Sequence, residues 1–312
     1  MRPRTDSFDE SCFVTQTGRG PYHFLLLPGL VPDGRETFHR QQSLFRAYGD
    51  TTTVTWPYDA FNLERVVEGL EQRIHAIGST GARPILVGVS VGGGIALELL
   101  RRNSAKPLPL AAVLLVSPMT CADDLAPLLK RFVEPIFNPP EGITSEEALE
   151  KGRTFFRTLA AKAIGEPLRS PWMSFFTPQG WMQLQENAIR QRIEKTLTGI
   201  PTGGGLERVQ AIQLLPGIHQ HRAHLSAMPT LITWGSRERP TLRMDGPGTG
   251  LLCRPDLAYR LFPDAEIHWI YEKDGGEVPH ASLLKHAKSF NPVIKRFLKR
   301  VAASGSKVAA AG

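Results

Sequence analysis

The sequence predicts an α/β fold in which a mainly parallel sheet is flanked by helices and carries an inserted helical cap. Short β-type runs alternate with helical stretches through most of the 312 residues, which is the pattern of a parallel sheet covered by helices. Several runs, such as ILVGV and AAVLLV, are apolar at successive positions, as strands buried on both faces must be. The predicted strands are residues 13–15, 23–27, 52–56, 85–89, 112–116, 230–234 and 266–271.

The alternation stops between the fifth and sixth runs, where about a hundred residues show helical periodicity alone. Residues 123–220 are therefore predicted to form a helical cap inserted into a core made of residues 1–122 and 221–312. Within the cap, Thr144 and Glu147 form a capping box, and Pro178 stands where a first helical residue would follow Thr177. The glycine run at residues 203–205 lacks the Lys and Ser or Thr of a phosphate loop and is expected to be a flexible connector.

The formal net charge of +7 is unevenly placed, because residues 281–312 contain seven lysines and arginines and no acid. Four apolar residues of this segment recur at helical spacing: Ile294, Phe297, Leu298 and Val301. They predict an amphipathic closing helix whose cationic face is solvated. The alternative is that this face binds nucleic acid or anionic lipid. Because the solvated face is the favoured interpretation, no nucleic-acid partner is expected. Residues 302–312 are predicted to be a disordered tail.

The composition is that of a folded globular protein, with 41% hydrophobic and 21% charged residues. The longest apolar stretch, at residues 108–119, is interrupted by Pro118 and is too short to span a bilayer, so no stable membrane insertion is expected. Three scattered cysteines, at positions 12, 121 and 253, form neither a disulfide framework nor a metal-ligand spacing. A cytoplasmic location is therefore expected. Nothing in the sequence indicates an oligomeric state.

A glycine-flanked motif, Gly88-Val89-Ser90-Val91-Gly92, stands between a predicted buried strand and a helix that reads GGGIALELL. A serine in such a turn is strained, and the flanking glycines remove Cβ atoms that would clash there. The serine hydroxyl is then exposed above the N-terminus of the next helix, where it is placed as a nucleophile. The alternative is a glycine-rich turn whose serine only caps the helix.

Four landmarks occur in order along the chain: LLLPGL at residues 25–30, GVSVGG at 88–93, PTLITWG at 229–235, and His280 after the last predicted strand. On these motifs the sequence resembles the α/β-hydrolase superfamily, and its serine esterases and lipases, over nearly all of the chain except the cap and the tail. The resemblance implies that the backbone N–H groups of Leu30 and Val91 form an oxyanion hole. Many relatives have His-Gly where this chain has Pro28-Gly29, a difference that affects the loop more than the amide.

His280 is the predicted general base, because an imidazole in the loop GGEVPH can reach over the sheet edge to Ser90. His268, within a strand pattern, and His286, within a helical one, are expected to be structural. The resemblance places the orienting acid three residues beyond the glycine of PTLITWG, at Glu238.

The acid has alternatives. Arg237 and Arg239 flank Glu238, so surface ion pairing is another role for it. Asp245, in the same long loop, is the first substitute as the acid. Asp123, after the preceding strand, is the second.

The predicted function is that of a serine hydrolase which cleaves a carboxylic ester or similar acyl bond through an acyl-enzyme on Ser90, with no metal or organic cofactor. Two alternatives remain: an acyltransferase that uses the same triad, and a ligand-binding protein that keeps the fold without a working acid. The substrate is expected to be a small molecule with apolar groups. That expectation rests on six apolar residues of the cap, namely Trp172, Met173, Phe175, Phe176, Trp181 and Met182.

Overall fold

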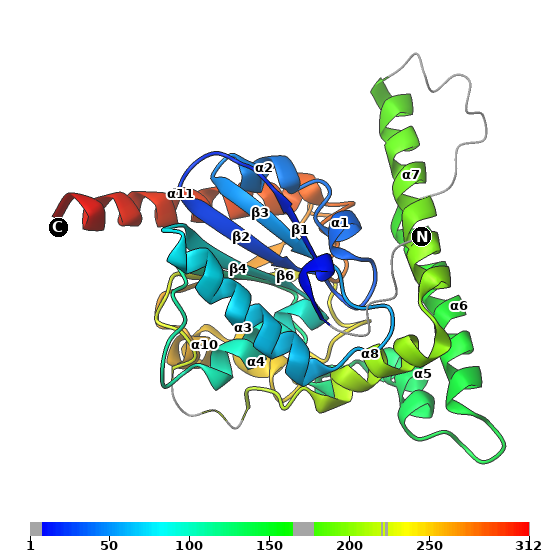
Figure 1. Cartoon of the computed structure of the whole chain (residues 1–312). Coiled ribbons are helices and arrows are strands. Elements are labelled where there is room, and N and C mark those ends of the chain that lie inside the picture. The colour runs from blue at the N-terminus through cyan, green and yellow to red at the C-terminus, as the bar shows by residue number, and fades with distance from the viewer. Residues whose placement is uncertain (1–7, 165–177, 220, 222–223, 312) are drawn as a thin grey trace.

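A seven-stranded sheet forms the centre of the protein, with the strand order β1-β3-β2-β4-β5-β6-β7 (Figure 1). The computed structural model describes residues 8–164, 178–219, 221 and 224–311. β1 is antiparallel to β3, and all other neighbouring strands are parallel. The strands are β1 (Phe13–Gln16), β2 (Tyr22–Leu27), β3 (Gly49–Val54), β4 (Arg83–Val89), β5 (Ala112–Val116), β6 (Thr230–Gly235) and β7 (Ala265–Ile270).

All seven predicted strands are present, so the predicted α/β class is confirmed. The third strand shows the largest shift, since it begins at Gly49 and not at Thr52. Its first residues, Gly49 and Asp50, pair with Tyr22 and His23 of β2. This pairing extends the strand toward its N-terminus, beyond the β-type run that predicted it.

Helices cover both faces of the sheet, as its doubly buried strands require. Phe24 and Leu26 of β2 pack in a core cluster with residues of α2 and α11. Leu25 and Leu27 point to the opposite face and pack with residues of α3 and α4. The helices outside the insertion are α1 (Gly34–Thr37), α2 (Gln42–Arg46), α3 (Leu63–Ser79), α4 (Val91–Arg102), α9 (Thr249–Cys253), α10 (Pro255–Leu261) and α11 (Ala287–Ala311), with short 3-10 turns at Glu10–Cys12 and Ala122–Asp124.

The insertion between β5 and β6 contains α5 (Pro127–Phe137), α6 (Ser145–Ile164), α7 (Pro178–Gly199) and α8 (Thr202–Leu214). α6 and α7 lie side by side and project away from the sheet (Figure 1). The capping box at the start of α6 is confirmed, because the Glu147 N–H donates to Thr144 Oγ1 at 3.2 Å and the Thr144 N–H donates to Glu147 Oε2 at 2.9 Å. Pro178 is the first residue of α7, as predicted.

The expectation of a flexible connector at residues 203–205 is wrong, because these glycines lie in the first turns of α8. A Cβ on Gly204 would lie 1.7 Å from the carbonyl oxygen of Tyr58. Glycine therefore lets the helix pack directly against the Tyr58 backbone. This contact outweighs the low helix propensity of glycine.

The closing helix α11 is amphipathic as predicted, and Ile294, Phe297, Leu298 and Val301 are all buried. The disorder predicted for residues 302–312 does not match the structure, in which α11 continues to Ala311. The segment is rich in alanine, the strongest helix former, and it extends a helix that is already anchored. No helix of the described residues is long and apolar enough to cross a membrane.

Candidate active site

Ser90 lies in a sharp turn between β4 and α4, with φ 52° and ψ −116°. Glycine is required on both sides of it. A Cβ on Gly88 would lie 2.6 Å from the carbonyl oxygen of Gly92, and a Cβ on Gly92 would lie 2.3 Å from that of Pro28. The Ser90 side chain makes no capping bond to α4. Its hydroxyl is therefore free for another partner, contrary to the alternative in which the serine caps the helix.

That partner is His280, in the loop between β7 and α11. Its Nε2 lies 2.9 Å from Ser90 Oγ, within a hydrogen bond. On the other side of the ring, Nδ1 lies 2.5 Å from Glu238 Oε2. The structure thus brings Ser90, His280 and Glu238, which are far apart in the sequence, into one chain of hydrogen bonds.

Glu238 follows β6 and its side chain is fully buried. Its Oε1 accepts hydrogen bonds from the Gly235 N–H at 2.7 Å and from the Ser117 hydroxyl at 2.5 Å. A buried carboxylate needs such donors, because it has lost its hydration. The flanking Arg237 and Arg239 are exposed, and Arg237 pairs with Glu277 at 3.5 Å. Surface ion pairing is therefore not the role of Glu238.

The two substitute acids lie at the surface. Asp245 pairs with Arg243 at 3.4 Å, and its side chain is 82% exposed. Asp123 pairs with Lys130 at 3.5 Å, and its side chain is 71% exposed. Neither of them bonds to His280.

Ser117 is a residue of the site that the sequence reasoning did not identify. It is fully buried and follows β5, with φ 45°. Its hydroxyl donates to Glu238 and accepts a hydrogen bond of 3.1 Å from the Ala281 N–H. Ser117 therefore joins the acid to the loop that carries His280. Its position directly after a buried strand, like that of Ser90, was the available signal.

A family model described as the alpha/beta hydrolase family matches residues 18–288. The chain belongs to the α/β-hydrolase family. No curated protein matches it in sequence. Among solved structures, MenH from S. aureus superposes with a TM-score of 0.63 at 16% identity, over 94% of this chain and 99% of that one.

Two esterases also share the fold of this α/β hydrolase. A thermophilic esterase from Thermogutta terrifontis has a TM-score of 0.60 at 15% identity, over 93% of each chain. The esterase RhEst1 from Rhodococcus sp. ECU1013 has a TM-score of 0.61 at 14% identity, over 93% of this chain and 95% of that one.

The two expected oxyanion-hole residues of this hydrolase belong to segments next to Ser90. Val91 is the first residue of α4, and the first N–H groups of a helix have no acceptor within it. Leu30 lies in the loop after β2, directly after Gly29, where a Cβ would be 3.4 Å from the Cβ of Ser90. The indole N–H of Trp56 donates a 3.0 Å hydrogen bond to the carbonyl oxygen of Gly29 and so anchors this loop.

Other titratable groups near the sheet edge have separate partners. His268 lies 3.3 Å from Glu266, and His286 lies 2.9 Å from Glu272. Burial lowers the pKa of His286 and outweighs the opposing charge of Glu272.

Burial raises the pKa of Cys253 strongly, and the nearby charge of Glu238 adds to this effect. Cys253 is therefore held as a thiol and is not a competing nucleophile.

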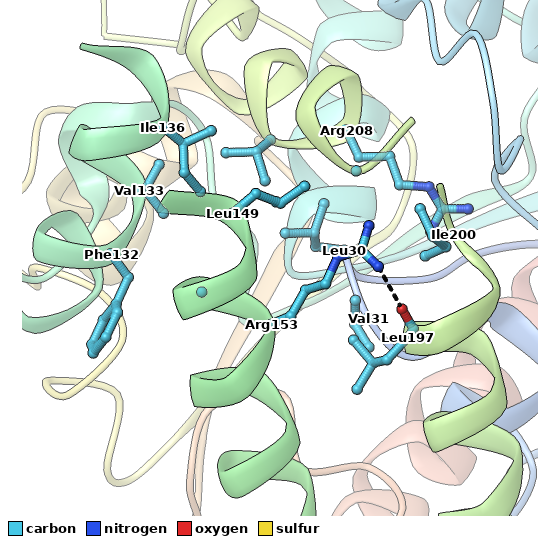
Figure 2. A pocket seen from close by; sticks show the side chains of 13 residues that line it. Leu30, Val31, Phe132, Val133, Ile136, Leu149, Arg153, Leu197, Ile200 and Arg208 are labelled. Carbon is cyan, nitrogen blue, oxygen red and sulfur yellow. Dashed lines mark hydrogen bonds between the residues drawn. The ribbon is translucent and has the colours of Figure 1, made fainter. Parts of the chain in front are cut away.

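A cavity of about 540 Å³, counted with its open part, lies between the helical insertion and the loop after β2 (Figure 2). Its walls are almost entirely apolar and come from α5, α6, α7, α8 and the Leu30 loop. The aromatic and Met residues 172–176, on which the expectation of an apolar substrate rested, lie outside the described residues. So do the side chains of Trp181 and Met182. The lining residues are Leu30, Val31, Phe132, Val133, Ile136, Leu149, Gly152, Arg153, Leu197, Ile200, Gly205, Arg208 and Val209.

Proposed function

We propose that this α/β hydrolase cleaves a carboxylic ester or similar acyl bond, with Ser90 as the nucleophile. The observation that carries the proposal is the pair of hydrogen bonds from His280, at 2.9 Å to Ser90 Oγ and at 2.5 Å to Glu238 Oε2. A nucleophile bonded to a base, with the base oriented by a third group, is the arrangement that activates a serine hydroxyl.

In the proposed reaction, His280 Nε2 takes the proton of Ser90 as Oγ attacks the acyl carbon. The carbonyl electrons move to oxygen, and the N–H groups of Leu30 and Val91 stabilise that oxyanion. When the tetrahedral intermediate collapses, His280 gives its proton to the leaving alcohol and an acyl-serine remains. Water then attacks the acyl-serine while His280 takes one of its protons, and His280 gives that proton to Ser90 Oγ as the acid leaves.

Glu238 is proposed to orient His280 and to stabilise its protonated form. Its Oε2 holds Nδ1, so Nε2 is directed at Ser90. Oε1 is occupied by Gly235 and Ser117, which prevents the carboxylate from turning away. A buried carboxylate held in this way favours the imidazolium that forms during the reaction.

Residues 123–220 are proposed to act as a cap that shapes the substrate site. The cavity beneath α5 to α8 reaches Leu30, the residue proposed to donate to the oxyanion. Its apolar walls suit the apolar part of a small ester. The three cysteines are free, and we propose a cytoplasmic location on that ground.

Turnover of nitrophenyl esters tests this function. Wild-type protein is expected to release nitrophenolate with a burst of about one equivalent when acylation is faster than deacylation, and Ser90→Ala is expected to lose both burst and turnover. Product analysis with an added alcohol separates hydrolysis from acyl transfer. Turnover that survives in Ser90→Ala would contradict the proposal.

A further inference from the structure

Two arginines line the cavity described above, whose other walls are almost entirely apolar (Figure 2). Arg153 comes from α6 and Arg208 from α8. Arginine side chains are rarely buried unless their donors are paired. Any guanidinium nitrogen that has no hydrogen-bond partner in the protein therefore indicates what kind of ligand the cavity could bind.

Arg208 is 2% exposed. Its Nη2 donates to the carbonyl oxygens of Trp56 at 2.7 Å and Pro57 at 3.0 Å, and its Nε donates to Pro57 at 3.1 Å. Its Nη1 is buried and has no hydrogen-bond partner within the described part of the chain. One edge of the guanidinium thus fixes the side chain, and the remaining nitrogen is left unpaired.

Arg153 repeats this arrangement. Its Nη1 donates to the carbonyl oxygen of Leu197 at 3.3 Å, and its Nε lies 3.1 Å from Glu150 Oε1. Its Nη2 is buried, and among the described residues it too has no partner. A Cβ added to Gly205 would lie 3.3 Å from this nitrogen, so Arg153 Nη2 is close to the Gly205 backbone of α8. Gly205 and Arg208 are three residues apart on α8 and so are neighbours on the helix surface.

We propose that Arg153 and Arg208 together bind a carboxylate of the substrate. This inference rests on the proposed function and names its substrate class, an ester that carries a free carboxylate on an apolar chain. Each guanidinium offers a buried, unpaired donor, which costs free energy until an acceptor fills it. A carboxylate supplies two acceptor oxygens and a negative charge, and apolar surroundings strengthen such bonds.

Neither of the acids near the two arginines forms a hydrogen bond with Arg153 Nη2 or Arg208 Nη1. Glu150 contacts Nε of Arg153, and its side chain is 53% exposed, so water screens its charge. Burial lowers the pKa of Arg208, and the negative charge of Asp33 opposes this effect. Asp33 Oδ2 accepts a hydrogen bond of 3.2 Å from the Tyr58 hydroxyl.

The placement fits an ester substrate. The cavity extends from the two arginines to Leu30 and Val31. Leu30 follows Gly29, which packs against Ser90. A chain held by its carboxylate between α6 and α8 would therefore extend through apolar walls toward the acyl bond at Ser90.

Equilibrium binding of two ligands of equal length, hexanoate and hexanamide, tests the site without requiring catalysis. Titration calorimetry of the full chain at neutral pH and low salt is expected to show hexanoate binding about tenfold tighter or more. Arg153→Met is expected to remove that preference, and Arg208→Met to do the same if it folds. Arg131→Met is the matched control, since Arg131 is an exposed arginine on α5 beside Phe132 of the cavity wall. It is expected to keep the preference.

Equal affinities for the two ligands, or no binding of either, would overturn the carboxylate site. A preference that survives in Arg153→Met, or is lost equally in Arg131→Met, would overturn it as well. Binding does not require Ser90 to react. A failure of ester turnover with hexanoate binding intact would count against the proposed function alone, and the reverse result would count against the carboxylate site alone.

Discussion

The indole N–H of Trp56 holds the carbonyl oxygen of Gly29 at 3.0 Å. That carbonyl and the N–H of Leu30 belong to the same planar peptide group. The bond therefore fixes the direction of the proposed oxyanion-hole donor. Trp56 is itself held, because its own carbonyl accepts from Arg208 at 2.7 Å. Trp56 is buried, and we therefore predict that it acts as a positioning residue.

Trp56→Phe is predicted to lower kcat by about tenfold with little change in KM, because a misdirected N–H weakens only the transition state. Kinetics with a nitrophenyl ester measure this split. Trp269→Phe is the control, since Trp269 is 40% exposed on β7. An equal loss in both variants, or a rise in KM alone, would argue against a role of Trp56 in orienting the Leu30 amide.

Ser117→Ala is predicted to reduce kcat by about tenfold. The change removes one of the three donors to Glu238 and the acceptor of the Ala281 N–H, so both the acid and the His280 loop lose a support. Ser79→Ala, at an exposed serine of α3, is the control for turnover. Because loss of structure would also reduce turnover, the activity is to be compared at equal folded fraction by circular dichroism. Full activity in folded Ser117→Ala would show that the Gly235 and His280 bonds suffice.

Glu238→Gln is predicted to lower kcat by about 10²-fold to 10⁴-fold while the fold is kept. The glutamine amide can turn its NH₂ group, which does not accept a hydrogen bond, toward His280 Nδ1, and it carries no negative charge to stabilise the imidazolium. Asp245→Asn and Asp123→Asn are matched controls at exposed acids and are expected to keep near-normal activity. Steady-state kinetics of the three variants decide the position of the acid. Near-normal turnover in Glu238→Gln with collapse in Asp245→Asn would move the acid to Asp245.

Two adjacent glycines of α8 are predicted to respond in opposite directions to alanine. Gly203 has open space around its Cβ position, so Gly203→Ala is expected to raise the free energy of unfolding by up to about 1 kcal/mol through helix propensity. Gly204→Ala would place a Cβ against Tyr58 and is expected to lower it by about 1 to 3 kcal/mol. Urea denaturation measures both changes. Two changes of the same sign would contradict the packing of α8 on the Tyr58 backbone.

The strands were predictable because each is a short local run of β-type residues, and several of them are apolar at successive positions. Ser90 stands at a glycine turn and His280 in the loop after the last strand, so a local pattern marks these two, whereas the resemblance to the family pointed to Glu238 after β6. Ser117 also stands directly after a buried strand, but neither it nor Trp56 lies in a motif that marks a catalytic role. Their roles come from which strand ends lie side by side and from one hydrogen bond across the sheet edge, which depend on the tertiary structure.

Two other features also depended on tertiary contacts. The glycines at 203–205 read locally as a break, but a tertiary contact with Tyr58 uses the missing Cβ. Arg153 and Arg208 are 55 positions apart in the printed sequence, and only the packing of α6 against α8 makes them walls of one cavity. The sequence reasoning did not identify these two arginines, because it could not show that α6 and α8 line the same cavity.

Labelling by a fluorophosphonate tests the central claim most directly, because the probe mimics the tetrahedral intermediate and reacts fast only with an activated hydroxyl beside a formed oxyanion hole. At neutral pH the folded wild-type protein is predicted to take up one equivalent at Ser90, as located by peptide mass spectrometry. Ser90→Ala is predicted to take up none, and His280→Ala is predicted to react much more slowly. Folded wild-type protein that stays unlabelled for hours, with the probe active on a control enzyme, would contradict the account of Ser90 as a catalytic nucleophile.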